Sequence, residues 1–323
     1  MDDRLYVIAP LFNPRGFRTR DALFLRFAAH VQSSGAVLVP VECAFGRRPF
    51  LCAQLEGPAV RVRTDQSLWL KENLINLGLA ALPPEAHYVS WVDADVQFVR
   101  PDWVAATIAE LQSYPIVQMF SQVLYLSPSF EPYQRHRGFA WGYANNQPHG
   151  RGHEFWLPGG AWATTREKIQ AVGGLLDRTL GAADHHMAYA LIDRVTDTVQ
   201  CAITEGHEAL LRSWQDLALD VFRCEVGCVE GTLLHFWHGS MASRQYLSRW
   251  AIIDSHRFDP LTDLAYRSDG LLTFTSAGQR LASAVEAYFY TRDEDSMSLP
   301  DDEVHDCFRP IFPTSHHQQS LVS

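Results

Sequence analysis

Two aspartates one residue apart, Asp93 and Asp95, interrupt an apolar stretch in the segment YVSWVDADVQFVRPDW. The apolar residues 88–92 before them predict a buried strand, and carboxylates at its end are costly unless a cation neutralises them. On an ideal strand the two side chains would point to the same side, about 7 Å apart, and a turn would bring them closer. A hard divalent ion with open coordination positions could then join them to a diphosphate. We therefore predict a Mn²⁺ or Mg²⁺ site here, with an ordinary acidic loop as the alternative.

Two histidines, His235 and His238, end a later apolar segment, LLHFWHGS. A neutral imidazole is a good ligand for ions such as Mn²⁺, and it would supply the third protein ligand that two aspartates alone lack. Either histidine could instead be a structural residue that is hydrogen-bonded in a turn. We favour His238 as the ligand over His235, because Gly239 next to it lets the backbone bend towards the site.

Asp184 lies where a loop enters a predicted helix, in LGAADHHMAYALI. Helix capping is one role for it. The other is that of a general base, because an ordinary carboxylate with a pKa of about 3.9 is ionised at neutral pH and can accept a proton from a hydroxyl. His185 beside it is expected to shape the binding of an acceptor. Gly159 and Gly160 would let the main chain approach a ligand closely.

A basic loop, LFNPRGFRTR, follows the first predicted strand. Its arginines, together with Lys71 in the segment KENLINLG, would place cations near strand ends, where they suit a diphosphate. A solvated turn is the alternative. The candidate nucleotide-binding residues are Pro10, Asn13, Arg18, Arg20, Lys71 and Asp93.

The elements that must position these groups alternate between strand and helix. Apolar runs at 5–10, 36–41 and 88–92 predict strands, and helical spacing over 23–31 and 70–82 predicts the helices between them. This order is typical of a parallel sheet with helices on both faces, in which ligands bind beyond the carboxyl ends of the strands. Further along, we expect a helix after Pro101, a strand over 116–126, a long functional loop over 127–158, helices near 166–172, 184–193 and 208–222, a strand over 229–236 and a helix over 244–255.

The composition is that of a globular protein of 323 residues, 47% hydrophobic and 20% charged. The net charge of −10 is uneven, because residues 293–306 hold seven acidic residues and no Lys or Arg, which leaves 30 acids against 27 bases elsewhere. Net charge therefore excludes no class of partner. The acidic start and the lack of a run of about 20 apolar residues indicate neither a signal peptide nor a membrane span. With six cysteines in a long chain, we expect reduced thiols and a cytoplasmic protein.

In their order along residues 5 to 250, these motifs resemble GT-A glycosyltransferases, nearest to the β-1,4-galactosyltransferases and polypeptide GalNAc-transferases. The resemblance implies an α/β fold of GT-A type, a Rossmann-like mixed sheet flanked by helices, in a single large domain with a C-terminal helical extension. We expect a GT-A domain over 1–256, with a nucleotide-sugar half over 1–125 and an acceptor half over 126–256. A helical extension over 257–292 and an acidic, polar tail over 293–323 would follow. The counterparts of the family motifs are Arg18 and Arg20, Lys71 to Gly78, Asp93 and Asp95, Gly159 and Gly160, Ala183-Asp184, and His235 or His238.

The resemblance also implies an inverting transfer from a nucleotide sugar, UDP-linked, to a hydroxyl. Asp184 would deprotonate the acceptor, and an ion held by Asp95 and His238 would stabilise the departing nucleoside diphosphate. Asp93 would contact the ribose or the ion. Two departures from the family pattern leave the acceptor open, because Ala183 replaces the glutamate before the base and His186 replaces the next acidic residue.

Other functions fit parts of the sequence. Asp184-His185-His186 is also a signature of DHH phosphoesterases, and a decayed transferase could bind sugar nucleotides without turnover. The acceptor could be a glycan or a hydroxymethylated pyrimidine in DNA, since the chain is similar to glycosyltransferases of large phages and microbes. The aromatic and cationic run 133–156, which includes Trp141, could hold sugars or contact a nucleic-acid backbone. The sequence leaves the oligomeric state open.

Overall fold

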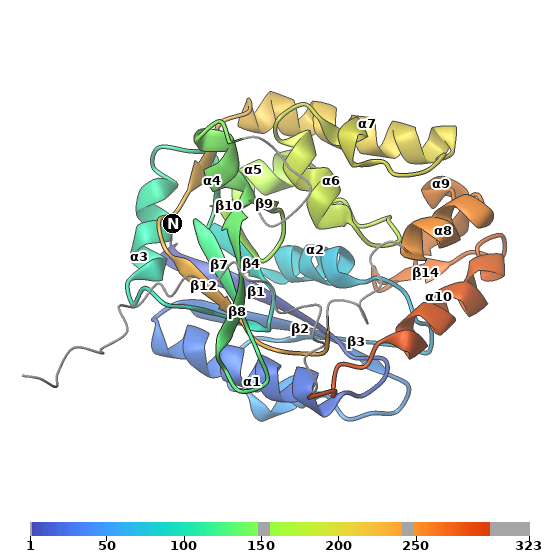
Figure 1. The fold of residues 1–323 in the computed structure, drawn as a ribbon, viewed down its shortest axis with the longest axis horizontal. Helices are drawn as coiled ribbons and strands as arrows, with labels where there is room; N and C mark the ends of the chain where they lie inside the picture. The colour runs from blue at the N-terminus through green and yellow to red at the C-terminus, as the bar shows by residue number, and fades with distance from the viewer. Residues whose placement is uncertain (1, 148–155, 241–247, 298–323) are drawn as a thin grey trace, which may run out of the picture.

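A mixed seven-stranded sheet forms the centre of the computed structural model, which describes residues 2–147, 156–240 and 248–297 (Figure 1). The strand order is β11-β6-β10-β4-β1-β2-β3, in which β4, β1, β2 and β3 are parallel and β10 is antiparallel to both of its neighbours. These strands are β1 (Asp2–Phe12), β2 (Val37–Phe45), β3 (Val60–Thr64), β4 (Ala86–Val92), β6 (Ile116–Gln118), β10 (Ala161–Thr165) and β11 (Val226–Cys228).

Helices cover both faces of this sheet. Alternate residues of β1 point to opposite sides, so that Leu5 and Val7 join one apolar core while Tyr6 and Ile8 join the other. The first core also contains the buried side of α1, and the second that of α2. The helices are α1 (Arg18–Ser33), α2 (Lys71–Ala81), α3 (Trp103–Glu110), α4 (Phe139–Ala144), α5 (Arg166–Ala171), α6 (Ala183–Ala190), α7 (Glu205–Phe222), α8 (Ser248–Ser255), α9 (Pro260–Asp263) and α10 (Gln279–Thr291), with short 3₁₀ helices at Leu51–Gln54 and Val195–Thr198.

Helix α2 packs unusually close to the sheet. A Cβ atom on Gly78 would lie 2.6 Å from a methyl carbon of Ile8 and 2.8 Å from one of Val41, so a residue without a side chain is required at this contact. Leu74 and Ile75 are buried on the same helix, and burial of each such side chain contributes about 2 kcal/mol. Since α2 follows β3 and runs back over the parallel strands, this packing fixes its first residue, Lys71, near their carboxyl ends.

A second sheet of five strands carries the histidine segment, in the order β5-β12-β7-β8-β9. Strand β12 pairs with β5 so that His235 lies opposite Val96, and the backbone N–H of Phe236 donates to the carbonyl of Asp95 at 2.8 Å. This register places the end of β12 directly beside the aspartate turn. The strands are β5 (Val96–Phe98), β7 (Gln122–Leu126), β8 (Pro132–Gly138), β9 (Trp156–Leu157) and β12 (Thr232–His235), and a separate hairpin joins β13 (Leu264–Tyr266) to β14 (Leu272–Phe274).

The predicted α/β class, with a mixed sheet between helices, is confirmed, but several elements differ from expectation. Strand β3 was not predicted, so the strand before Asp93 is the fourth and not the third. The strand expected over 116–126 divides at residues 119–121 into β6 and β7, which belong to different sheets. The long loop expected over 127–158 contains β8 and α4, while residues 148–155 of it lie outside the described residues. Polar residues in β8 alternate with buried ones, and this alternation was misinterpreted as a loop.

Two further observations concern the whole chain. Among the described residues, no helix combines the length and apolar character needed to cross a membrane. The five cysteines in the described part of the chain form no disulfide there.

Candidate active site

A cavity of about 260 Å³ opens at the carboxyl ends of β1 and β4. The antiparallel strand β10 begins at the same edge, where the N–H of Asp93 donates to the carbonyl of Gly160 at 2.8 Å. This topology brings together motifs that are far apart in the sequence. The predicted site residues that line the cavity are Pro10, Asn13, Arg20, Lys71, Asp93, Asp95, Gly159, Gly160, Asp184, His235 and His238.

Asp95, His235 and His238 form a cluster whose possible ligand atoms all lie within 4.8 Å of one another. Nε2 of His238 is 2.9 Å from Oδ2 of Asp95, and Nε2 of His235 is 3.9 Å from Oδ1 of the same carboxylate. Within the described part of the chain, buried Asp95 Oδ1 has no hydrogen-bond partner. One carboxylate and two imidazoles suit a divalent ion such as Mn²⁺, and the cluster therefore fits the predicted metal. Both candidate histidines belong to it, but Asp93 does not.

The charge of Asp95 is matched by its neighbours. Burial alone would raise the pKa of this carboxyl, but the imidazoles of His235 and His238 outweigh that effect and hold the pKa well below its usual range. Asp95 is therefore an anionic ligand at neutral pH.

Lys71 joins the carboxylates at the other side of the cavity. Its Nζ lies 3.3 Å from Oδ1 of Asp93, 3.5 Å from Oδ2 of Asp184 and 3.7 Å from Oε1 of Glu72. A cation is normally disfavoured at the first residue of a helix, where the helix dipole is positive. Burial also acts against the ammonium, but the three carboxylates prevail and raise the pKa of Lys71 well above its usual value. Asp93 thus pairs with Lys71 and not with the histidines.

Asp184 is the second residue of α6, and the residue before the helix is Ala182 with φ of 63°. It is therefore not the N-cap, and its Oδ1 accepts the N–H of His185 at 2.8 Å. A Cβ on Gly159 would lie 2.5 Å from Oδ2 of Asp184, so a glycine is needed there to leave room for the carboxylate. Burial opposes ionisation, but Lys71 and Arg249 outweigh it and lower the pKa of Asp184. An ionised carboxylate in this position can accept a proton.

The pKa of Glu72, beside Lys71, predicts how the stability of the fold depends on pH. Burial raises its pKa to about 7, although Lys71 acts in the opposite direction. The folded state binds the proton of the Glu72 carboxyl more tightly than the unfolded state does. The stabilisation that follows is fully present below the ordinary pKa of 4.5 and is lost as the pH rises through about 7. Glu72→Gln is therefore expected to raise the free energy of unfolding by about 1–3 kcal/mol at pH 8 and to change it little at pH 5, measured by urea denaturation. An equal effect at both pH values would contradict this assignment.

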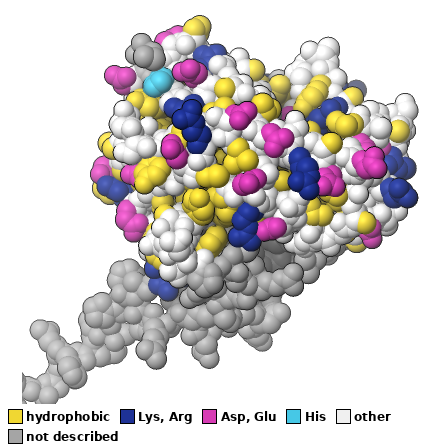
Figure 2. Space-filling view, turned by 90° about the horizontal axis from the view of Figure 1, so that it is seen from above, with side chains coloured by type: hydrophobic (Ala, Val, Ile, Leu, Met, Phe, Trp, Pro, Cys, Tyr) yellow, Lys and Arg dark blue, Asp and Glu magenta, His cyan; other side chains and the backbone are white. Residues whose placement is uncertain are grey.

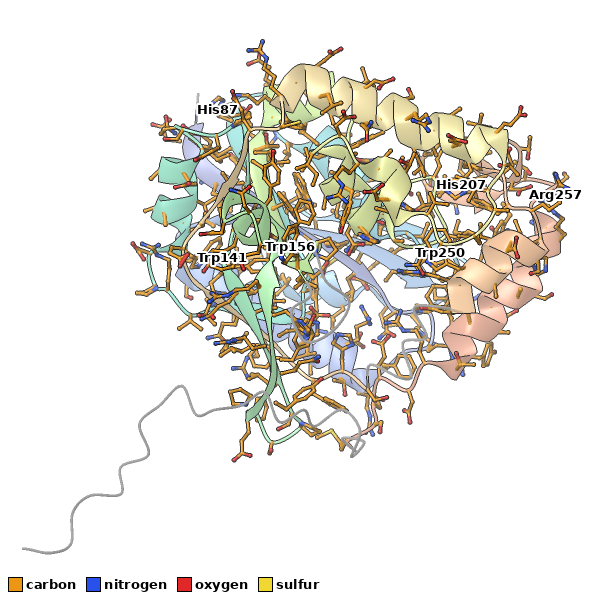
Figure 3. The ribbon with its side chains drawn as sticks, turned by 45° about the horizontal axis from the view of Figure 1, so that its top comes forward. His87, Trp141, Trp156, His207, Trp250 and Arg257 are labelled. Carbon is orange, nitrogen blue, oxygen red and sulfur yellow. The ribbon has the colours of Figure 1, made fainter. Side chains whose placement is uncertain are left out.

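Three predicted site residues do not line the cavity. Arg18 is exposed, and its contact is a backbone N–H that donates to Oδ2 of Asp295 at 3.1 Å. Trp141, labelled in Figure 3, lies on α4, where the guanidinium of Arg137 sits 4.1 Å from its ring. His185 packs edge-on against Tyr189.

Asn13 lines the cavity, but its side chain is used in the basic loop. Its Oδ1 accepts the N–H groups of Gly16 and Phe17, and its Nδ2 donates to the carbonyl of Phe17 and to Asp21. Both ends of the amide are therefore used in hydrogen bonds that hold the loop in shape. Pro10 and Arg20, which were predicted with Asn13 to bind the nucleotide, also line the cavity.

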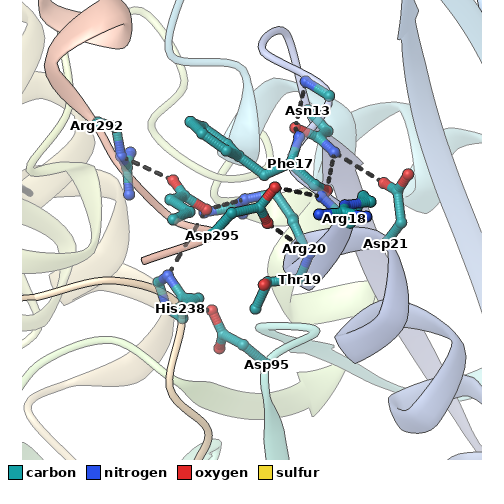
Figure 4. A network of polar contacts seen from close by, with 12 residues as sticks. Asn13, Phe17, Arg18, Thr19, Arg20, Asp21, Asp95, His238, Arg292 and Asp295 are labelled. Carbon is teal, nitrogen blue, oxygen red and sulfur yellow. Dashed lines mark hydrogen bonds and ion pairs between the residues drawn. The ribbon is translucent and has the colours of Figure 1, made fainter. Parts of the chain in front are cut away.

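The sequence missed a cluster at the C-terminal side of the cavity. Glu294 is 3% exposed, and its carboxylate lies 2.6 Å from Nε of Arg20 and 2.8 Å from Nε of Arg292, two side chains that Figure 4 labels. Burial is outweighed by Arg20 and Arg292, which lower the pKa of Glu294 to about 2. The tail predicted over 293–323 was a wrong interpretation for this residue, because a run of acids without bases is usually solvated, whereas Glu294 has two arginine partners. Other lining residues missed by the sequence analysis are Trp69, Glu72, Arg249, Tyr288, Phe289 and Arg292.

Comparison with known proteins gives fold similarity only. No family model matches the chain, and no curated protein matches its sequence. A Drosophila β1,4-galactosyltransferase 7 mutant, solved with manganese, UDP-Gal and xylobiose, is 13% identical with a TM-score of 0.36, over 59% of this chain and 61% of that one. The chain thus spans about three fifths of that enzyme.

Two other solved structures match over more of their length. Mannosyl-3-phosphoglycerate synthase from Rubrobacter xylanophilus is 12% identical with a TM-score of 0.40, over 84% of this chain and 85% of that one. Inositol-1-phosphate CTP transferase from T. maritima is 9% identical with a TM-score of 0.38, over 72% and 88%. Glycosyltransferases and nucleotidyltransferases are thus among the solved structures that this chain is similar to, and scores this low carry no argument about activity.

Proposed function

We propose that this chain is a metal-dependent glycosyltransferase that takes its sugar from a nucleotide-sugar donor. One observation supports it above others: a carboxylate and two imidazoles at ligand distance share a single cavity with the ionised carboxylate of Asp184. The first group suits a cation, and the second suits a proton acceptor.

The ion would be held by Asp95, His235 and His238. We propose Mn²⁺, because an imidazole ligand suits Mn²⁺ better than it suits Mg²⁺. When bound, such an ion acts as a Lewis acid that offsets negative charge on a leaving diphosphate. Arg20 and Lys71 line the same cavity and add positive charge for that group.

The nucleoside would lie towards Asp93 and the aromatic side of the cavity. Trp69 has its ring 4.7 Å from that of Tyr288 and 5.2 Å from that of Phe289, and all three line the cavity. A base can stack on such rings, and Asp93 can accept a hydrogen bond from a ribose hydroxyl. We propose uridine diphosphate as the carrier.

Asp184 would accept the proton of the acceptor hydroxyl as that oxygen attacks the sugar, which makes the reaction a single inverting displacement. A hydroxyl-bearing glycan and a hydroxymethylated base in DNA both remain candidate acceptors. Figure 2 shows one face of the molecule, on which acidic and basic side chains are interspersed, without the basic stripe that a nucleic-acid backbone prefers.

The phosphoesterase alternative loses support from the placement of its histidine pair. His186 is buried, its Nδ1 is hydrogen-bonded to the hydroxyl of Thr198, and burial lowers its pKa to about 3. Neither His185 nor His186 lines the cavity that contains Asp93 and Asp95.

The test is a cleavage screen of nucleotide sugars with Mn²⁺, with Mg²⁺ and with a chelator. We expect release of a nucleoside diphosphate with metal and at least about a hundredfold less with chelator, since the ion supplies several kcal/mol of transition-state stabilisation. Tight donor binding without turnover would instead indicate a binding protein. Hydrolysis of simple phosphate esters, with sugar nucleotides left intact, would indicate a phosphoesterase.

A further inference from the structure

After α10 the chain lines the cavity with Arg292 and Glu294, and we call residues 292–296 the C-terminal strap. This segment is more than 270 residues away in sequence from the α1 groups it contacts. Figure 4 shows its polar contacts with the start of α1 and with His238. The strap is thus a separate structural addition to the site.

Glu294 is the buried centre of the strap. Two arginines, one from α1 and one from the strap itself, hold its carboxylate at 2.6 and 2.8 Å. On its third side lies Nδ1 of His238, 3.7 Å from Oε2 of Glu294. A carboxylate is costly to bury, and its position between two cations and an imidazole fixes its place closely.

His238 therefore lies between two carboxylates. Its Nε2 is 2.9 Å from Asp95 Oδ2 in the cluster, and its Nδ1 is turned to Glu294 outside it. Metal-binding histidines commonly use one ring nitrogen for the ion while a carboxylate interacts with the other, which fixes the tautomer and the ring orientation. Asp95, His238 and Glu294 follow this order, with the Glu294 carboxylate at an ion-pair distance of 3.7 Å from the ring and not within hydrogen-bond distance.

The strap is hydrogen-bonded both to the start of α1 and to Trp237 beside His238. Helix α1 has no side-chain cap of its own at Phe17, and Asp295 supplies one by accepting the N–H groups of Arg18 and Thr19 at 3.1 and 2.8 Å. On the other side, Nε1 of Trp237 donates to the carbonyl of Ser296 at 2.5 Å.

Gly239 explains how the strap can approach the histidine loop. Its φ is +86°, and a Cβ there would overlap with the carbonyl oxygen of Asp293. A glycine is therefore required for close contact, beyond the bend that its backbone allows. The strap and the loop of His238 pack as one unit.

We propose that Glu294 is a positioning residue, which orients the imidazole of His238 for a divalent cation. The inference rests on the metal cluster of the proposed function. The strap then has a role in the reaction, because the ion-binding geometry is complete only when residues 292–296 are docked on α1.

The experiment measures Mn²⁺ binding to the full-length chain, without donor, from the signal of free Mn²⁺ in electron paramagnetic resonance. Glu294→Gln is expected to weaken Mn²⁺ binding about 10–100-fold. Glu294→Asp keeps a negative charge between Arg20 and Arg292 but shortens the side chain and withdraws the carboxylate from His238, so we expect it to lose Mn²⁺ affinity while it stays folded, as a cooperative melting curve would show. Glu286→Gln, an exposed residue on α10, is the matched control and should bind like the wild type.

The outcomes separate this inference from the proposed function. If the wild type binds no Mn²⁺, both are overturned. If the wild type binds and both Glu294 variants bind within about twofold of it, the positioning role is wrong and the metal site stands. If Glu294→Gln does not fold, Glu294→Asp decides, and the visible spectrum of bound Co²⁺ provides a second measure of a changed ligand geometry that loss of stability alone would not produce.

Discussion

Asp95→Ala is expected to lower the rate of donor cleavage about a thousandfold or more at a Mn²⁺ concentration that saturates the wild type. The carboxylate is the one acidic member of the cluster with His235 and His238, so its loss leaves two imidazoles for the ion. Lewis-acid stabilisation of a leaving diphosphate amounts to several kcal/mol, and about 1.4 kcal/mol corresponds to a factor of ten in rate. The measurement is the initial rate of nucleoside diphosphate release, with Mn²⁺ affinity determined on the same preparation.

The experiment includes one surface control and two further variants of the cluster. Asp216→Ala removes an exposed carboxylate from α7 and should leave both quantities unchanged. The single variants His235→Ala and His238→Ala should each weaken Mn²⁺ binding, because both rings belong to the cluster. The proposed role of Asp95 as a metal ligand is contradicted if Asp95→Ala binds Mn²⁺ as the wild type does. It is also contradicted if the rate of the variant stays within a factor of about three of the wild type, which corresponds to less than 1 kcal/mol.

The part of the site that could be predicted from the sequence follows from a topological rule. Parallel strands bring their carboxyl ends to one edge, and β1 and β4 were recognisable as apolar runs, so Pro10, Asp93 and Asp95 had to lie close together. His235 and His238 lie beside the aspartate turn because β12, in the second sheet, pairs antiparallel with β5. That pairing is not part of the rule, and the sequence analysis chose the two histidines for the ligand chemistry of imidazole. For Pro10, Asp93 and Asp95, an element and its end were enough to fix the position.

The remainder depends on pairings that no local pattern encodes. Glu294 looks like one more acid in a solvated run, and only its two arginines, one of them more than 270 residues away, make it a buried residue. Asn13 was predicted to bind a nucleotide, but an asparagine that shapes its own loop has the same local sequence. Trp141 was placed at a ligand because aromatic residues suit one, whereas here α4 directs it towards Arg137.

Asp184→Asn is expected to lower the rate of sugar transfer about 100- to 10,000-fold, the range of a lost general base, while Mn²⁺ affinity stays within about twofold of the wild type. An amide has the size of the carboxylate but cannot take a proton from a hydroxyl. Asp184 is not a member of the cluster with Asp95, and Nζ of Lys71 lies 3.5 Å from its Oδ2. The measurement is single-turnover transfer to an acceptor that the donor screen identifies, at saturating donor and metal.

Gly159→Ala tests the same step without removing the charge. Its Cβ would lie 2.5 Å from Oδ2 of Asp184, and no positive φ constrains the glycine, so the substitution displaces the carboxylate and leaves the backbone unstrained. We expect a loss of transfer in the same direction but smaller, with Asp220→Asn on the exposed side of α7 as the matched control. If Asp184→Asn retains more than about a third of the wild-type rate, Asp184 is not the base, because so small a change is below 1 kcal/mol. In that case its contact with Lys71 would be structural, and the proton would have to leave through another cavity-lining group.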